Sequence, residues 1–155
     1  MRSTGKKLCA GEYFYEDLIL GDWYETSALV VTEAHIISFA GLSGDFFDIH
    51  IDDEFARKHG FPGRVAHGLL GLALTDGLKN RSAVRIMAIA SLGWNWHFRR
   101  PILVNDRISA RVYVAGLRLS RKGQHIATLS FDVTKQDGST VQDGETTLLV
   151  RSRNG

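Results

Sequence analysis

The chain has 155 residues, of which 44% are hydrophobic and 23% charged, and this balance indicates a soluble globular protein of one domain. Its net charge of +2 is too small to indicate binding to nucleic acid or to an anionic membrane surface. The single cysteine, Cys9, excludes an internal disulfide framework and favours a reducing location, the cytoplasm.

The sequence leads us to expect neither a signal peptide nor a membrane-spanning segment. Residues 1–11 are basic but lack the apolar core of a signal peptide. No apolar run in the chain approaches the roughly 20 residues that span a bilayer. We expect residues 1–11 to form a flexible tail and residues 12–155 to form a single domain.

The next segments predict a strand and two short helices. Residues 26–31 (TSALVV) predict the strand, and residues 32–42 predict a helix that Thr32 caps and a following glycine ends. Residues 52–60 predict a second helix, because acids open it and bases close it. Between these helices, residues 44–53 (GDFFDIHIDD) read as a loop that holds an unusual group of acids, phenylalanines and a histidine.

One long helix is predicted over residues 66–78. Its sequence leaves almost no polar face, so we expect it to be buried nearly all round. The chain then changes to an alternating period, which predicts half-buried antiparallel strands over residues 92–98, 108–114 and 129–133. Hairpin turns are expected at residues 121–123 and 136–139.

These elements predict an α+β fold in which an antiparallel sheet wraps around the long central helix. Nothing else in the chain is apolar enough to cover that helix. Because a small sheet of this kind leaves open edges, we expect two copies to pair as a homodimer or a higher homo-oligomer.

Several segments resemble the MaoC-like dehydratases, the (R)-specific enoyl-CoA hydratases of the hot-dog fold. The resemblance rests on SGDFFDIHIDDEFARKHGFPGRVAHGLLGLALTDGL, and on EDLILGDWYE, WNWHFRRPILVNDRI and FDVTKQDGSTVQDGE around it. It covers roughly residues 12–150, and the Asp, His and His-Gly arrangement is fairly specific. It implies that Asp45 and His50 are the catalytic acid and histidine, and that the Gly68 N–H holds the thioester carbonyl.

Four positions need separate attention. Phe47 stands where the family usually has Asn, and Asp48 stands where it usually has Pro. Phe46 and Phe47 suggest an occluded acyl pocket and therefore a short or branched substrate. Asp76 lies near a position where some hydratases carry a serine, and we expect Phe47 and Asp76, with Gly68, to contact substrate.

Chemistry supports the same residues independently of the family. Addition of water to a 2-enoyl thioester needs a base, an acid and a stabiliser for the enolate oxygen. A partly buried Asp45 and His50 can hold one water, take its proton and return one. Gly68 at a helix N-terminus offers a free N–H and no side chain to keep the thioester away.

Structural roles for the same residues, and two other functions, stay open. Asp45 and His50 can be ordinary loop residues, Gly68 a packing glycine, and His67 a structural residue at the helix start. A hot-dog thioesterase can use Asp76 to activate water, and a catalytically silent subunit can bind acyl-CoA without reacting. Assay with crotonyl-CoA separates hydration, thiol release and binding alone.

We expect no metal and no cofactor other than the coenzyme A of the thioester substrate. The six histidines form no HExxH motif and no Cys–His cluster. Coenzyme A needs cationic contacts for its phosphates, and five basic residues are candidates: Arg99, Arg100, Arg118, Arg121 and Lys122.

Overall fold

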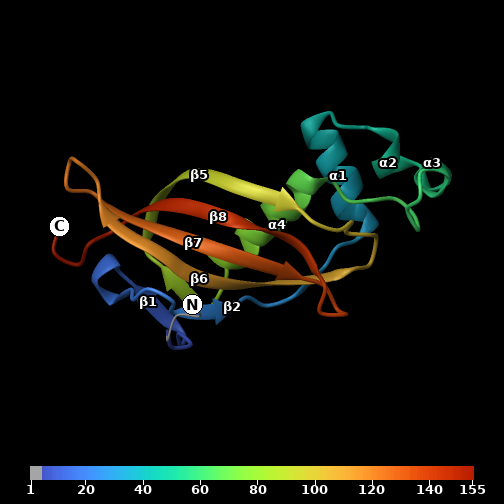
Figure 1. Ribbon diagram of the computed structural model, residues 1–155. Coiled ribbons are helices and arrows are strands. Elements are labelled where there is room, and N and C mark those ends of the chain that lie inside the picture. Colours follow the sequence, from blue (N-terminus) through green and yellow to red (C-terminus); the bar gives the residue numbers. More distant parts are fainter. Residues whose placement is uncertain (1–4) are drawn as a thin grey trace.

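The computed structural model describes residues 5–155 and contains a curved antiparallel sheet, one long helix and a group of short helices (Figure 1). The strands are β1 (Gly11–Tyr13), β2 (Trp23–Glu25), β3 (Leu29–Val30), β4 (Val84–Ile86), β5 (Ala88–Phe98), β6 (Arg107–Leu119), β7 (His125–Thr134) and β8 (Thr140–Val150). The α-helices are α1 (Glu33–Ser43), α2 (Asp48–Ile51), α3 (Asp53–Lys58) and α4 (Gly68–Asn80), and a 3-10 turn covers Tyr15–Asp17. Among the described residues, no helix has the length and apolar character needed to cross a membrane.

The main sheet has the strand order β2-β6-β7-β8-β5, and β3 adds to β6. The three longest pairings, β6 with β7, β7 with β8 and β8 with β5, are antiparallel. The sheet curves around α4, as Figure 1 shows. The predicted α+β architecture, the three alternating strands and both hairpin turns are therefore confirmed.

The core lies between α4 and the concave face of the sheet. Leu70, Thr75 and Leu78 of α4 are buried together with Leu129 and Leu148 of the sheet. The expectation that this helix is buried nearly all round is wrong for a single chain. The sheet covers only one side of α4, and Leu69 on the other side is exposed.

The short helices project beyond the end of the sheet, at the right of Figure 1. Thr32 caps α1 by accepting a hydrogen bond from the His35 N–H, and Gly44 ends this helix at a φ of 78°. The second predicted helix is α3, which Asp52 caps. Sequence patterns did not predict α2, which lies in the segment expected to be a loop, and the strand predicted over residues 26–31 is only β3.

The predicted flexible tail is partly wrong. Residues 1–4 lie outside the described part of the chain. Leu8, by contrast, is buried in the core, and its N–H donates to the Trp23 carbonyl. Lys7 forms a bridge with Trp23, so residues 6–8 pack along β2, and Gly11 begins β1, which pairs with β4. The sequence did not predict this contact because the segment is basic and Leu8 is its only large apolar residue that becomes buried.

Candidate active site

The left-handed turn at the end of α1 positions an acid opposite a histidine. Gly44 adopts a φ that favours glycine, and Asp45 follows it directly. The short helix α2 follows and carries His50. The Nε2 atom of His50 lies 4.0 Å from Asp45 Oδ2. This gap is too long for a direct hydrogen bond, but one water can bridge two polar groups across such a distance.

The orientation of the His50 ring is set by a main-chain carbonyl. Nδ1 lies 2.6 Å from the Val65 oxygen, so Nδ1 carries the proton and donates it to this bond. Nε2 therefore keeps its lone pair on the side of Asp45. Burial lowers the pKa of His50 below its ordinary value, although Val65 and Asp45 act in the opposite direction. A neutral imidazole with a free lone pair at neutral pH is suited to act as a base.

Asp45 is more open than expected. Its side chain is 52% exposed in the single chain, whereas that of His50 is 13% exposed. The Phe47 N–H donates to Asp45 Oδ1, and this contact leaves Oδ2 for the histidine side. The expectation of a partly buried Asp45 therefore does not hold for one subunit.

His67 joins the site through contacts that only the folded chain reveals. It is 2% exposed, and its Nε2 lies 2.9 Å from the main-chain oxygen of Asp45. Its ring stacks on that of His50 with centroids 3.8 Å apart. The sequence predicted that His67 has a structural role at the helix start, and its position is compatible with that role. The sequence did not predict that His67 contacts both Asp45 and His50.

These three residues also form the tightest group of possible metal ligands among the described residues. One ligand atom from each of Asp45, His50 and His67 lies within 4.8 Å of the others. The two imidazole planes are only 26° apart, so their lone pairs run side by side instead of meeting at one point. His67 Nε2 is also engaged with the Asp45 carbonyl, and we assign no metal here.

The first turn of α4 lies tightly against the sheet. A Cβ on Gly68 would come within 2.4 Å of the Phe98 ring, and one on Gly71 within 2.3 Å of Gln142. Gln142 Nε2 donates to the Gly68 carbonyl at 3.0 Å, and Trp96 Nε1 donates to Gln142 Oε1 at 2.9 Å. This chain of contacts fixes the start of α4, whose first N–H groups have no acceptor within the helix.

A cavity of about 270 Å³ joins the histidine to this helix start. His50 and Gly68 both line it, and Phe61, Phe98 and Ile102 provide apolar wall. The site therefore brings together the Asp45–His50 pair, an apolar space and a helix N-terminus.

Comparison with known proteins agrees with this arrangement. The family model of the MaoC like domain matches residues 19–147, most of the chain. The chain belongs to the MaoC-like domain family. Its hot-dog fold follows from the same comparisons, since the solved MaoC-like dehydratase from Rhodospirillum rubrum has a TM-score of 0.78 at 26% identity, covering 90% of this chain and 99% of that one.

Three further comparisons give proteins with functional names. The (R)-specific enoyl-CoA hydratase of Aeromonas caviae is 33% identical over 117 residues, which is 76% of this chain and 84% of the relative. The solved (R)-hydratase from A. caviae has a TM-score of 0.73 and 29% identity, and covers 88% of this chain and 99% of that one. The (R)-specific enoyl-CoA hydratase of Rhodospirillum rubrum is 28% identical over 91% of this chain and 94% of its own.

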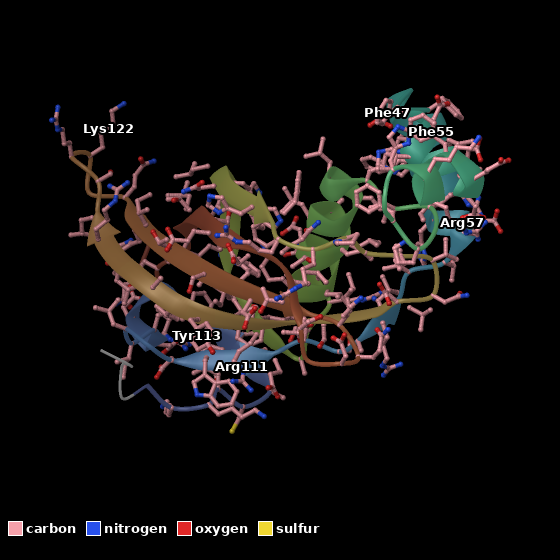
Figure 2. All side chains as sticks on the ribbon, turned by 45° about the vertical axis from the view of Figure 1, so that its right-hand side comes forward. Phe47, Phe55, Arg57, Arg111, Tyr113 and Lys122 are labelled. Atoms are coloured by element: carbon pink, nitrogen blue, oxygen red, sulfur yellow. The ribbon has the colours of Figure 1, made fainter. Side chains whose placement is uncertain are left out.

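Phe47, which stands where the family usually has Asn, lies beside His50 but is not part of the cavity wall. The Phe47 ring is exposed, contacts Phe55 edge-on with centroids 6.1 Å apart, and lies 6.3 Å from the His50 ring (Figure 2). It does not line the cavity between His50 and Gly68. The suggestion that Phe47 narrows an acyl pocket therefore has no support in one subunit.

Asp76 lies apart from the acid–histidine pair. Eight residues separate it from Gly68, which places it about 12 Å further along the axis of α4. Its Oδ1 lies 2.6 Å from Lys79 Nζ, so it forms an ion pair on the same helix. This position does not bring Asp76 to the thioester carbonyl expected at Gly68.

The five candidate contacts for coenzyme A divide into two groups. Arg99 and Arg100 line the cavity, although Arg99 also donates two hydrogen bonds to Asp143. The other three, Arg118, Arg121 and Lys122, lie on or beside the hairpin between β6 and β7. Figure 2 shows Lys122 at the opposite end of the molecule from Phe47, so within one chain this group does not reach the site.

Proposed function

We propose that this MaoC-like protein adds water reversibly to a 2-enoyl-CoA and forms an (R)-3-hydroxyacyl-CoA. One observation carries the proposal: Asp45 Oδ2 and His50 Nε2 face each other at a distance of 4.0 Å, close to the start of α4. The names of the relatives support the reaction and its stereochemistry: (R)-specific enoyl-CoA hydratase in two and 3-hydroxybutyryl-CoA dehydratase in a third.

In the proposed reaction, Asp45 and His50 hold one water between them. The His50 Nε2 lone pair takes a proton as the water oxygen bonds to C3 of the substrate. The electrons of the C2–C3 double bond move to the thioester oxygen, and the Asp45 carboxylate stabilises the imidazolium that forms. The imidazolium then returns its proton to C2, so that one water is added in total.

The start of α4 is proposed to stabilise the enolate oxygen. The Gly68 N–H is at the positive end of the helix dipole and lacks an intrahelical acceptor. A donor of this kind is commonly worth about 10²–10³ in rate. Gln142 donates to the Gly68 carbonyl, which helps to hold the first turn of α4 in place beside the cavity.

The MaoC-like enzyme is proposed to act as a homodimer or higher homo-oligomer in the cytoplasm. The outer edge of β5 ends the main sheet, and Ile89 and Leu92 on this strand are exposed, as is Leu69 of α4. Apolar groups at a sheet edge are usually covered by a partner.

The exposed and unpaired Cys9 fits a reducing compartment. Coenzyme A enters as part of the substrate, and Arg100 at the cavity is a candidate contact for its phosphates.

Incubation with crotonyl-CoA tests the proposed reaction. Hydration removes the absorbance of the conjugated thioester without releasing thiol, and chiral analysis of the product should give the (R) isomer. Release of free thiol would instead favour the thioesterase alternative, with an attacking group other than the distant Asp76. Tight binding without either change would favour a silent acyl-CoA-binding subunit.

A further inference from the structure

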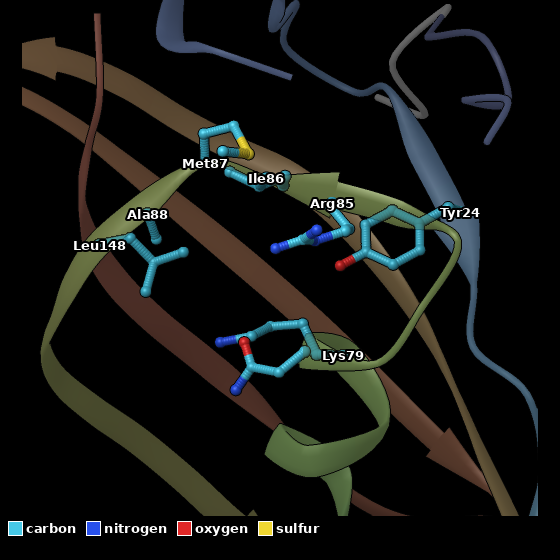
Figure 3. A pocket seen from close by; sticks show the side chains of 8 residues that line it. Tyr24, Lys79, Arg85, Ile86, Met87, Ala88 and Leu148 are labelled. Carbon is cyan, nitrogen blue, oxygen red and sulfur yellow. The ribbon is translucent and has the colours of Figure 1, made fainter. Parts of the chain in front are cut away.

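A second cavity lies at the other end of α4, where the helix leads into β4 and β5 (Figure 3). Its volume is about 250 Å³. Polar groups of Tyr24, Lys79, Asn80 and Arg85 line one part of it, and apolar side chains that include Ile86 and Leu148 line the rest. The proposed hydration chemistry at His50 uses none of these groups.

Tyr24 directs a hydroxyl towards this cavity. The residue as a whole is only 3% exposed, and no hydrogen bond joins its hydroxyl to another of residues 5–155. Figure 3 shows this hydroxyl facing the same space as the Arg85 and Lys79 side chains. Burial, and secondly the charge of Asp76, raise the pKa of Tyr24, so the hydroxyl keeps its proton and is available as a donor. The hydroxyl opens onto the cavity from an otherwise buried ring, and a ligand in the cavity can accept its hydrogen bond.

Lys79 adds a second donor at the same cavity. Its side chain is only 10% exposed and lies over the Trp94 ring, 5.6 Å from the centroid. Its contact with Asp76 Oδ1 is close but lacks the alignment of a hydrogen bond. Asp76 balances the charge of Lys79, and Glu12 lies 3.7 Å from Arg85, so the cavity has surplus N–H and O–H donors without a large net charge.

This cavity and the proposed reaction centre lie along the same helix and the same pair of strands. Gly68 and Lys79 are eleven residues apart, which is about 16 Å along the axis of α4. Phe98 pairs with Gln142 at the end near the reaction centre, and Ala88 pairs with Val150 at the end near the second cavity. A chain held by its thioester at Gly68 and running along α4 leads towards Tyr24 and Lys79.

We propose that this second cavity receives the distal end of the acyl chain and selects substrates whose chain ends in an oxygen acceptor. The inference rests on the proposed hydration of 2-enoyl-CoA esters and adds the class of acyl group. A carboxylate, a hydroxyl or a carbonyl at the end of an otherwise apolar chain matches the donors of Tyr24 and Lys79 and the apolar wall around them. A terminal methyl group would displace water from these donors without offering them an acceptor, which is unfavourable.

The test compares paired substrates on the intact protein. Straight-chain 2-enoyl-CoA esters of increasing length are each matched with the ester whose terminal methyl is replaced by a carboxylate or a hydroxymethyl group. At the lengths that reach the cavity, we expect the oxygen-ended ester to have about tenfold higher kcat/KM, as one or two hydrogen bonds provide. Equal or better kcat/KM for the methyl-ended esters at every length would overturn the inference. A preference for the carboxylate ester alone would indicate recognition of charge, whereas a preference for both oxygen-ended esters would indicate recognition by hydrogen bonds.

Tyr24→Phe gives the sharpest variant because the hydroxyl has no protein partner to lose. We expect this variant to keep its thermal stability and its activity on crotonyl-CoA, which is too short to reach the cavity, and to lose the preference for oxygen-ended esters. Lys79→Met is the second variant, and it should act in the same direction. An unchanged preference in both variants would overturn the inference while leaving hydration intact. Failure of the wild type to hydrate crotonyl-CoA would instead remove the proposed function itself.

Discussion

At the scale of single residues, the arrangement around His50 depends on contacts far apart in the sequence. Asp45 and His50 could be nominated from the sequence because they resemble a known motif. The sequence could not show that Val65 fixes the ring of His50, nor that His67 stacks on it and binds the Asp45 carbonyl. These contacts arise only when α2 folds against the start of α4, so no local pattern encodes them.

The lowered pKa of His50 gives a prediction about pH. As a base, His50 must be unprotonated, and a pKa below the ordinary histidine value keeps it so to more acidic pH. Activity should therefore be retained as the pH falls past the ordinary pKa of histidine, and it should be lost only at a lower pH. Titration of the His50 ring signals by NMR, beside the pH profile of kcat/KM, checks this. A midpoint at or above the ordinary histidine value would contradict it.

Phe47 offers a prediction about rate. Phe47→Asn should alter kcat, because the side chain lies beside His50, but it should leave the chain-length profile unchanged, because Phe47 does not line the cavity. The measurement is kcat/KM over a series of 2-enoyl-CoA lengths. Phe46→Asn is the matched control, since Phe46 is a neighbouring exposed phenylalanine. A shift of the optimum towards longer chains in Phe47→Asn would restore the view that this ring narrows the acyl pocket.

At the scale of elements, the long helix and the strands follow from the sequence better than the short segments do. The alternation over β5, β6 and β7 and the apolar run of α4 are strong periodic signals. The four residues of α2 are too few to show a period, and Phe47 provides no side-chain cap at its start. The length of a periodic signal therefore decides which elements can be predicted.

The first turn of α4 gives a prediction about close packing. A Cβ added by Gly68→Ala would overlap the Phe98 ring and displace it from its place in the cavity wall, so we expect kcat/KM to fall on the order of 10²-fold. Gly77→Ala is the control on the same helix, because its Cβ meets no atom within 4 Å and alanine favours helix. Steady-state kinetics and thermal melting of both variants check this. Equal activity in the two variants would contradict the packing argument, and Phe98→Ala combined with Gly68→Ala should relieve the overlap.

At the scale of the whole molecule, the exposed apolar surface beside β5 is the largest departure from the pattern expected of an isolated domain. Alternation placed Leu92 and Phe98 on the buried face of a strand, yet both are exposed in one chain. The reason is position, because β5 is an edge strand and only Trp94 and Trp96 on it reach the core cluster. Sequence periodicity identifies an apolar face but does not say whether the same chain or a second copy covers it.

The oligomeric state is predicted from this surface. Wild-type protein should sediment as a dimer or larger assembly at micromolar concentration, and Leu92→Lys should weaken the assembly by placing a charge in the apolar edge. Leu119→Lys, at an equally exposed leucine at the end of β6, should leave it unchanged. A wild-type protein that sediments as a monomer would contradict the prediction.

The kinetics of the acid–histidine pair test the central claim most directly. Hydration of crotonyl-CoA is measured for wild type, Asp45→Asn, His50→Ala and the double variant, with thermal melting to verify that each variant is folded. Each single variant should lower kcat by at least about 10²-fold, the scale of lost general acid–base catalysis. The double variant should be little worse than either, because residues that share one step are strongly non-additive. Turnover close to wild type in folded Asp45→Asn or His50→Ala would contradict the account.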